Sequence, residues 1–460
     1  MSQGDAGWDL ASRTFETWWT RSGGWRAVNA AAARRTSQMI TFARAASPYY
    51  SDVWRGLPDD VALRDLPAVT KHDLMARFDD WVTDRSLDRR AVDDFLGDRT
   101  RIGQFLRGRF LVWKSSGTTG EPGIFVQDRA ALAVYDALLA VQLQSSPAAA
   151  SFAWGMFTQG GRAALVSATG DHFASISSWL RACHDSPWAK ARALPVTAPL
   201  PDLVAQLNEY QPAFLASYPT TLALLADEQR EGRLRIAPAC VWSGGEHLSP
   251  AMRATIERAF RATLVNEYGA SECMSIAFSC PLGHLHVNAD WVVLEPVDRD
   301  RRPTAPGEAS HTVLLTNLAN RVQPIIRYDL GDRVTLCDRP CACGSPLPVI
   351  RPEGRRDDVL ALRAVDGRIV RLSPLALSTV VEDAAPSHRF QLVQTAADHI
   401  GLRLATRTPG ERRAEWHAAR DALHAYLVSQ ALPNVRVTLE AGAPVPDARS
   451  GKLREVIAEA

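Results

Sequence analysis

The sequence predicts an α/β fold, in which a large N-terminal α/β domain is followed by a small α+β domain. Short β-rich runs alternate with helical stretches between about residues 108 and 345, a pattern typical of a sheet with helices on its faces. This pattern changes at about residues 352–358. The chain of 460 residues is also too long for one ordinary hydrophobic core. We therefore predict one domain over residues 1–353 and a second over residues 354–460.

The first part of the chain, up to about residue 100, is predicted to be a helical entry segment. Its apolar residues recur at spacings of three and four. Four tryptophans occur before residue 30, and they include Trp18, Trp19 and Trp25. Because large indole rings favour burial, we expect them to pack this segment onto the larger body. An aromatic box around a ligand is the alternative.

The middle of the chain supplies the strands and helices of the predicted sheet. The β-rich runs are "FLVWK", "AALVSA", "AFLAS", "ACVWSGG", "ATLVNEYG", "WVVLEPV" and "HTVLLTNL". The helical stretches include "ALAVYDALLAVQLQ" and "PAMRATIERAFRA". This alternation favours an α/β sheet over an all-helical or all-β domain.

The C-terminal part begins with a predicted hairpin, "VLALRAVDGRIVRLS", whose two-residue turn signal is Asp366 and Gly367. A helix "LALSTVVEDAA", strands "RFQLVQTA" and "GLRLAT", a helix "RRAEWHAARDALHAYLVSQ" and a strand "VRVTLE" follow. These elements suffice for a small independent α+β domain.

The composition excludes several classes of function. Hydrophobic residues make up 46% and charged residues 22%, and no apolar run approaches the length of a membrane span. The net charge is +1 without a block of like charge, so we expect neither a nucleic-acid nor a membrane partner. The N-terminus lacks the features of a secretory signal, and the seven cysteines are an odd number. We therefore expect a cytoplasmic protein without a disulfide framework.

The stretch "WKSSGTTGEPGIFVQD" combines hydroxyl side chains and glycines directly after a β-rich run. Such a loop offers backbone N–H groups and hydroxyl donors to phosphate oxygens, although a plain surface turn has the same composition. The nucleotide-binding pattern GxxxxGK[ST] is absent, because Glu121 follows Gly120. An ordinary kinase or ATPase loop is therefore excluded.

The loop "SSGTTGEPG" resembles the phosphate-binding loop of the adenylate-forming superfamily, which includes acyl-CoA synthetases, luciferases and nonribosomal adenylation domains. Further similar stretches follow in that superfamily's order: "SGGEHLS", "NEYGASE", "IIRYDLGDRV", "GRRDDVL" and "DARSGKLREV". Segments such as "ASPYYSDVW" and "SYPTTLALLA" resemble the phenylacetate-CoA ligase and coenzyme F390 synthetase group. The resemblance covers nearly the whole chain and implies a mobile C-terminal domain, with the active site between the domains.

The resemblance also implies the residues that bind ATP. The β- and γ-phosphates would lie in the loop formed by Ser115, Ser116, Gly117, Thr118, Thr119 and Gly120. The strand and turn beside the adenine would contain Gly244, Gly245 and Glu246, and the aromatic motif Tyr268 and Gly269. Asp332 would accept both ribose hydroxyls, and Arg355 would contact ribose or phosphate.

Three residues carry the implied chemistry. Glu272 would hold Mg²⁺, and Lys452 would bridge the attacking carboxylate and the α-phosphate in the transition state. Asp357 would be the hinge about which the C-terminal domain rotates between two half-reactions.

A structural zinc site is implied as well, because the resembling group often carries a Cys, a His and a later Cys-x-Cys. The candidate ligands are Cys280, His286, Cys341 and Cys343, with His284 as the alternative histidine. Two short ligand pairs on separate loops suit the tetrahedral geometry that zinc favours.

We therefore predict an AMP-forming acid:CoA ligase that activates a small, aromatic carboxylic acid with ATP. Residues similar to those that line the acid site are Trp154, Met156, Phe157, Tyr218, Gly244 and Ala270. Trp154, Met156 and Phe157 would suit a strand in the hydrophobic core equally well. The segment "LRAVDGRIVRLSP" departs from the turn that approaches CoA in the resembling ligases. An amine acceptor is therefore an alternative, and a catalytically silent nucleotide-binding protein is another. A homodimer is suggested by resemblance only.

Overall fold

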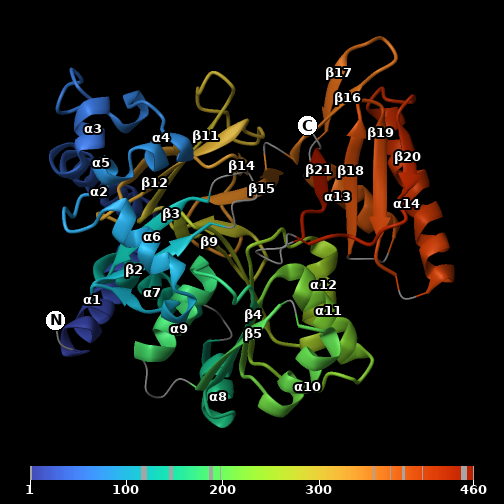
Figure 1. The fold of residues 1–460 in the computed structure, drawn as a ribbon, viewed down its shortest axis with the longest axis horizontal. Helices are drawn as coiled ribbons and strands as arrows, with labels where there is room; N and C mark the ends of the chain where they lie inside the picture. The colour runs from blue at the N-terminus through green and yellow to red at the C-terminus, as the bar shows by residue number, and fades with distance from the viewer. Residues whose placement is uncertain are drawn as a thin grey trace.

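The computed structural model describes residues 3–115, 122–144, 149–185, 190–196, 198–355, 358–372, 374–385, 389–406, 408–446 and 453–458. Helices form the N-terminal segment, as predicted, and pack at one side of the large domain (Figure 1). They are α1 (Gln3–Ser22), α2 (Gly24–Ala46), α3 (Pro48–Val53), α4 (Lys71–Ala76), α5 (Phe78–Trp81) and α6 (Arg89–Gly97). Two short 3₁₀ turns cover Leu63–Asp65 and Arg99–Arg101.

The centre of the large domain is a nine-stranded sheet with the order β14-β15-β10-β9-β8-β7-β6-β4-β5. The strands from β5 to β8 are parallel, and those from β8 to β14 are antiparallel. Their bounds are β4 (Arg162–Ser167), β5 (Lys190–Pro195), β6 (Phe214–Ser217), β7 (Cys240–Gly244), β8 (Thr263–Ala270), β9 (Cys273–Ser279), β10 (Leu285–Val287), β14 (Asp332–Leu336) and β15 (Val349–Arg355).

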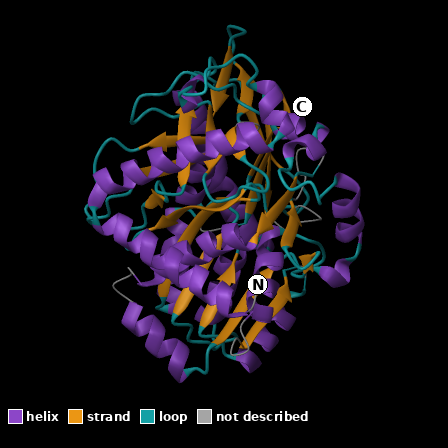
Figure 2. Ribbon diagram, turned by 90° about the vertical axis from the view of Figure 1, so that its left-hand side faces the viewer, coloured by secondary structure: helices purple, strands orange, loops and turns teal. Residues whose placement is uncertain are grey.

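Helices cover the parallel part of this sheet, and Figure 2 shows strands in the interior with helices outside them. The helices are α7 (Arg129–Gln144), α8 (Ala149–Thr158), α9 (Ala174–Asp185), α10 (Leu200–Tyr210), α11 (Pro219–Arg230) and α12 (Pro250–Phe260). On one face, leucines of α10 and α11 and Ile256 of α12 pack on Val166, Leu215 and Val241 of the strands. The alternation of strands and helices in the sequence thus gives the predicted α/β domain.

Two smaller sheets complete the large domain. The first contains β1 (Phe105–Leu106), β2 (Phe110–Lys114) and β3 (Ile124–Asp128), and the second contains β11 (Val292–Val297), β12 (Thr312–Asn317) and β13 (Ile325–Asp329). Both sheets share a hydrophobic core with the N-terminal helices and with one face of the nine-stranded sheet.

The C-terminal part has its own hydrophobic core, formed between Leu360 and Val456. Its elements are β16 (Leu360–Arg363), β17 (Ile369–Leu372), α13 (Pro374–Ala384), β18 (Phe390–Ala396), β19 (His399–Leu404), α14 (Pro409–Ser429), β20 (Arg436–Leu439) and β21 (Val456–Ala458). All of them except β21, which follows the last predicted strand, match the helices and strands predicted from the sequence. The predicted boundary at residues 353–354 falls inside β15, which ends at Arg355.

The hairpin turn differs from the prediction in length. The backbone N–H of Ala364 donates to the carbonyl oxygen of Arg368 at 2.8 Å, so three residues rather than two lie in the loop. Gly367 adopts a φ of +82°, which glycine reaches without steric cost. The turn signal therefore located the loop but not its length.

The expected burial of the early tryptophans is wrong. Trp18, Trp19 and Trp25 are 48%, 65% and 46% exposed. The cause lies on the opposite face of α1, where Thr17 is fully buried and Arg21 binds Asp290 at 2.9 Å. Since α1 is attached to the large domain through polar and charged side chains, the indole rings of Trp18 and Trp19 face outward.

Candidate active site at the strand ends

The candidate site lies where the parallel strands β6, β7 and β8 end. Ligands of open α/β sheets bind in the crevice outside the carboxyl ends of such strands. Tyr218 follows β6, Gly245 follows Gly244 at the end of β7, and Tyr268 lies near the end of β8. Three separate motifs of the sequence therefore meet at one edge of the sheet.

The hydroxyl- and glycine-rich loop connects two antiparallel strands, β2 and β3. Residues 116–120, which are Ser116, Gly117, Thr118, Thr119 and Gly120, lie outside the described residues. Ser115 begins the loop, and its Oγ accepts a hydrogen bond from the N–H of Gly123 at 2.8 Å. The N–H of Ser115 in turn donates to the carbonyl oxygen of Gly123 at 2.9 Å. The two ends of the loop are thus fixed to each other.

The turn between β8 and β9 is held in place by two hydrogen bonds. Trp113 Nε1 donates to the carbonyl oxygen of Ser271 at 2.8 Å, and Asn317 Nδ2 donates to that of Glu272 at 3.2 Å. A Cβ on Gly269 would lie 1.8 Å from the carbonyl oxygen of Met274, so this position admits only glycine. The predicted motif therefore has a steric requirement for Gly269 that is independent of any nucleotide.

Tyr268, Asp332 and Arg355 form a hydrogen-bonded group. The Tyr268 hydroxyl donates to Asp332 Oδ2 at 2.7 Å, and Arg355 Nη1 lies 3.2 Å from Asp332 Oδ1. Asp332 and Arg355 are also cross-strand partners on β14 and β15. Burial, followed by the charge of Asp332, raises the pKa of Tyr268 well above its usual value, so its hydroxyl remains a donor. The two predicted ribose contacts thus hold each other in place.

Glu272 lies close to this group and is buried. The Tyr328 hydroxyl donates to Glu272 Oε1 at 2.7 Å. Burial raises the pKa of Glu272, while the Tyr328 hydrogen bond and the Arg355 charge lower it. A carboxyl group in this environment is a hard oxygen ligand of the kind that Mg²⁺ prefers, and the cation's charge would favour its ionised form.

Glu246 connects the two domains. Its Oε2 accepts hydrogen bonds from the N–H of Thr220 at 3.2 Å and from the Thr220 hydroxyl at 2.8 Å, at the start of α11. Its Oε1 accepts a hydrogen bond from the N–H of Leu453 at 2.8 Å. The predicted Lys452 precedes Leu453 but lies outside the described residues, as does the predicted hinge residue Asp357.

The segments that flank these two undescribed residues are tied together within the C-terminal part. Arg454 forms an ion pair with Asp358, which is partly screened from solvent. Asp358 follows the predicted hinge, and Arg454 lies two residues after the predicted lysine. The hinge end and the lysine end of the C-terminal part are therefore in contact.

A cluster of sulfur and nitrogen atoms lies at the antiparallel side of the nine-stranded sheet. Its members, whose ligand atoms all lie within 4.8 Å of one another, are Cys280, His286, Cys341 and Cys343. Cys280 Sγ and Cys341 Sγ are 3.9 Å apart, and Cys343 Sγ and His286 Nε2 are 3.4 Å apart. A tetrahedral zinc ion bound to sulfur and nitrogen gives ligand separations of about 3.5–3.8 Å, so the donor set fits zinc.

The two histidines near this cluster differ in their surroundings. His286 is buried, and its Nδ1 lies 2.9 Å from the carbonyl oxygen of Leu347. Metal-binding histidines usually donate from their second ring nitrogen in this way, which leaves Nε2 for the ion. His284 is exposed, and its Nδ1 lies 3.2 Å from Cys341 Sγ. The geometry therefore favours His286 as a ligand and places His284 beside the cluster.

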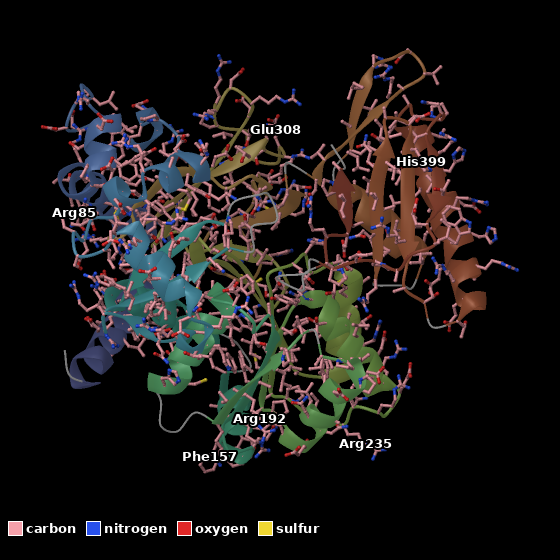
Figure 3. The ribbon with its side chains drawn as sticks, viewed as in Figure 1. Arg85, Phe157, Arg192, Arg235, Glu308 and His399 are labelled. Atoms are coloured by element: carbon pink, nitrogen blue, oxygen red, sulfur yellow. The ribbon has the colours of Figure 1, made fainter. Side chains whose placement is uncertain are left out.

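Two of the residues expected to line the acid site lie elsewhere. Trp154 and Phe157 are on the helix α8 rather than on a core strand, and they are 67% and 78% exposed. Figure 3 shows Phe157 at the outer edge of the molecule. Tyr218, in contrast, is buried at the strand ends, where its hydroxyl accepts a hydrogen bond from the N–H of Ala168 at 3.3 Å.

Glu267 is a residue of the site that the sequence analysis missed. It precedes Tyr268 on β8, and its carboxylate accepts hydrogen bonds from Trp242 Nε1 at 2.9 Å and from the Ser275 hydroxyl at 3.0 Å. Burial raises the pKa of Glu267 to about 7. The available signal was an acidic residue in the middle of a strand otherwise predicted to be buried.

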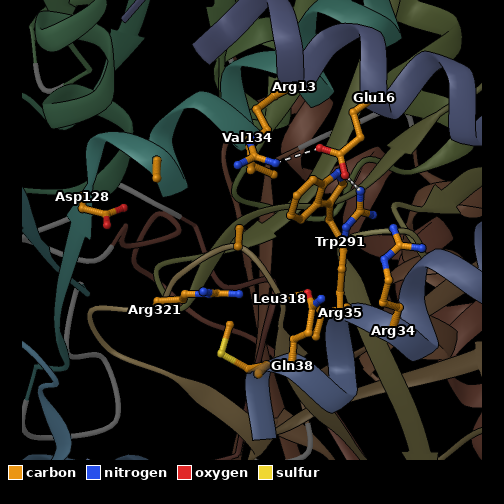
Figure 4. Close-up of a pocket in the computed structure, with 13 residues that line it drawn as sticks. Arg13, Glu16, Arg34, Arg35, Gln38, Asp128, Val134, Trp291, Leu318 and Arg321 are labelled. Atoms are coloured by element: carbon orange, nitrogen blue, oxygen red, sulfur yellow. Dashed lines mark hydrogen bonds and ion pairs between the residues drawn. The ribbon is translucent and has the colours of Figure 1, made fainter. Parts of the chain in front are cut away.

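A cavity of about 270 Å³ lies under the N-terminal helices, away from the strand ends (Figure 4). Arg13 and Arg35 both contact Glu16 there, at 2.8 and 2.6 Å. The Arg35 guanidinium also lies 3.6 Å from the ring centre of Trp291. Because these two arginines are compensated by neighbours, we interpret the contacts as the attachment of α1 and α2 to the large domain.

The described helices include none with the length and apolar character required to cross a membrane. No known protein-family model matches the chain. The curated Protein CapK of Staphylococcus aureus is 25% identical over 135 residues, which cover 29% of this chain. The match spans only 28% of that relative's length.

Two solved structures of a 2-hydroxyisobutyryl-CoA ligase are similar over almost the whole chain. In the postadenylation state with 2-HIB-AMP, that ligase is 21% identical with a TM-score of 0.66, and the match covers 94% of this chain and 90% of that one. In the thioesterification state with 2-HIB-AMP and CoA, it is 22% identical with a TM-score of 0.52, over 94% and 89%. The chain therefore has the fold of the adenylate-forming ligases, with a large α/β domain and a smaller C-terminal part.

Proposed function

We propose that the protein activates a small carboxylic acid with ATP, forming an acyl-AMP and releasing pyrophosphate. The observation that carries this proposal is the meeting of Tyr268, Glu272, Asp332 and Arg355 at one end of the sheet. These residues come from three motifs that are far apart in the sequence. Their proximity is required if one nucleotide is to contact all of them.

The chemistry explains why these residue types are needed. A carboxylate resists nucleophilic attack, and transfer to AMP supplies a phosphate leaving group. The carboxylate must first approach a polyphosphate of the same charge sign, and Coulomb repulsion is strong in a cleft of low dielectric. Mg²⁺ held by Glu272 would neutralise part of the phosphate charge. Lys452 and the donors of the loop that starts at Ser115 would stabilise the charge that develops at the α-phosphate.

Asp332 and Arg355 would position the nucleotide. In the structure the Asp332 carboxylate is already oriented by Tyr268 and Arg355. A carboxylate fixed in this way loses little conformational freedom when it accepts the two hydroxyls of a ribose. Tyr268 would then lie against the adenine while its hydroxyl still binds Asp332.

We propose CoA as the acceptor of the acyl group, with an amine as the alternative. Pyrophosphate release from ATP and Mg²⁺ tests both, when a panel of aryl and short acids is run with CoA, with hydroxylamine and with neither. We expect multiple turnovers that require CoA. Turnover with hydroxylamine and none with CoA would assign an amine acceptor, and no release with any acid would contradict acid activation.

Glu246→Ala tests the contact between the domains. The substitution leaves the N–H groups of Thr220 and Leu453 without their carboxylate partner, so we expect the adenylation rate to fall by about tenfold. Thioester formation from pre-formed acyl-AMP should change little, because the rotated C-terminal domain would not use this contact. Exchange of pyrophosphate into ATP measures the first step, and Thr220→Val, which removes only a hydroxyl donor, is the control. An equal loss in both half-reactions would contradict this role.

We also propose that Cys280, His286, Cys341 and Cys343 bind a structural zinc ion. The ion would join the turn after β9 to the segment between β14 and β15. All of its four positions would be filled by protein ligands, which is typical of structural rather than catalytic zinc.

A further inference from the structure

The cavity under the N-terminal helices has an excess of positive side chains. It is enclosed by α1, α2, the start of α7 and the loop between β12 and β13. The charged residues described in its lining are Arg13, Arg34, Arg35 and Arg321, together with Glu16 and Asp128. Four positive and two negative groups give these side chains a formal charge of +2.

Both acidic residues of the cavity already have partners. Glu16 accepts hydrogen bonds from Arg13 at 2.8 Å and from Arg35 at 2.6 Å. Asp128 Oδ1 accepts a hydrogen bond from the N–H of Ala131 at 2.8 Å, in the first turn of α7. A carboxylate at this position is also stabilised by the positive end of the helix dipole. Neither acid is therefore needed to compensate the other two arginines.

Those two arginines, Arg34 and Arg321, are exposed and form no ion pair with any residue that the structure describes. The Arg321 guanidinium lies 5.2 Å from the ring centre of Phe42. Burial lowers the pKa of Arg35, and the charge of Arg34 lowers it further, so Arg34 acts on the same cavity electrostatically. An anion beside Arg34 and Arg321 would reduce this repulsion between like charges.

The two arginines belong to different parts of the large domain. In Figure 4, Arg321 extends toward the middle of the cavity from the side opposite Arg34. The carbonyl oxygen of Arg321 accepts a hydrogen bond from the Thr83 hydroxyl at 2.8 Å, and Asn320 Nδ2 donates to the carbonyl oxygen of Val126 at 2.9 Å. The loop that carries Arg321 is thus fixed to β3, whereas Arg34 is on α2. A ligand held by both would join α2 to the sheets.

The rest of the lining is partly apolar. Met39, Val134 and Leu318 are buried and contribute aliphatic or thioether groups to the cavity. Its volume of about 270 Å³ corresponds to roughly nine water molecules at about 30 Å³ each. The cavity can therefore enclose a small organic molecule that has charged groups and an aliphatic body.

We propose that this cavity binds a small organic anion with two negative charges, a dicarboxylate or an organic phosphate, between Arg34 and Arg321. Two negative charges match the excess charge of the described lining residues. Guanidinium groups bind carboxylate and phosphate oxygens through paired hydrogen bonds, which favours these two chemical classes. The inference does not depend on the proposed function, because the cavity is away from the strand ends.

The test is isothermal titration calorimetry of the full chain without nucleotide, using probes of similar shape and different charge. Succinate carries two negative charges, succinamate one and succinamide none. We expect one saturable site per chain for succinate, weaker binding of succinamate and no binding of succinamide. Binding should weaken as salt is added, because mobile ions screen exposed charges. Methyl phosphate in place of succinate tests the phosphate class, and failure of both dianions to bind would overturn the proposal.

Two variants locate the site. Arg34→Gln and Arg321→Gln each remove one charge, and we expect each to weaken the binding of the dianion by roughly tenfold. Arg299→Gln is the control, because Arg299 is an exposed arginine on the turn after β11 and does not line the cavity. The unfolding temperature without ligand should change little in all three variants, since none of these side chains has an ion pair with a described residue.

A second measurement is the unfolding temperature with and without succinate. A ligand that binds only the folded chain should raise this temperature in the wild type and in Arg299→Gln, and raise it less in Arg34→Gln and Arg321→Gln. A succinate molecule bound at the strand ends would instead bind Arg34→Gln and Arg321→Gln as tightly as the wild type. That result, or equal binding of succinamide, would overturn the assignment.

Discussion

Lys452→Ala should reduce the rate of acyl-AMP formation by about 10²-fold or more, with the fold intact. The expected size follows from the loss of one preorganised donor at a developing negative charge. The two residues after Lys452 have defined contacts. The N–H of Leu453 donates to Glu246, and Arg454 forms an ion pair with Asp358. Because Leu453 and Arg454 supply the contacts described for this segment, stability should not change.

The measurement is pyrophosphate exchange with the best acid of the panel. Lys190→Ala is a matched control, because Lys190 is an exposed lysine at the start of the edge strand β5. Thioester formation from supplied acyl-AMP should survive in Lys452→Ala, since the lysine is proposed to act only in the first half-reaction. Near-normal adenylation in this variant would remove Lys452 from the mechanism.

Loss of the metal should destabilise the large domain by on the order of 5 kcal/mol, because metal-binding free energy at a closed site is also folding free energy. The ligands come from the turn between β9 and β10 and from the segment before β15. Without the ion, these segments would be held mainly by the short β10 pairings. We expect one zinc per chain by elemental analysis, and a lower unfolding temperature after chelation or in Cys343→Ser.

Cys337→Ser is the control for this prediction, because Cys337 is exposed and lies outside the cluster. Substitution of each histidine in turn identifies the ligand. His286→Ala should lose the metal, whereas His284→Ala should retain it. A purified protein without metal, together with an unchanged unfolding temperature in Cys343→Ser, would disprove the zinc site.

The sequence predicted the elements well because local patterns determine them. The run "FLVWK" became β2, and the helix predicted over residues 412–430 corresponds to α14, which has a capping box at Thr408 and ends at Ser429. The order of strands in the sheet could not be predicted in the same way. β10 lies between β9 and β15. Its pairing with β15 joins residues more than sixty positions apart in the sequence. Such long-range pairing depends on the three-dimensional path of the chain and leaves no local pattern.

The wrong prediction for Trp19 and the overlooked Glu267 have one physical cause. Both depend on which residues of other elements contact the side chain in the folded protein. Trp19 was expected to be buried because of its size, but the polar contacts of Arg21 and Thr17 determine which face of α1 is inside. Glu267 was missed for the complementary reason. Nothing next to it in the sequence shows that its strand neighbours would be Gly244 and Phe278 or that Trp242 and Ser275 would donate to its carboxylate.

The strand β15 has a mechanical consequence for any rotation of the C-terminal part. At its start, Val349 pairs with His286 of the sulfur–nitrogen cluster, and at its end Arg355 pairs with Asp332. A strand clamped at both ends resists twisting along its length. A rotation of the C-terminal part is therefore expected to change backbone torsion angles after Arg355 and to leave the pairing of β15 in the sheet unchanged.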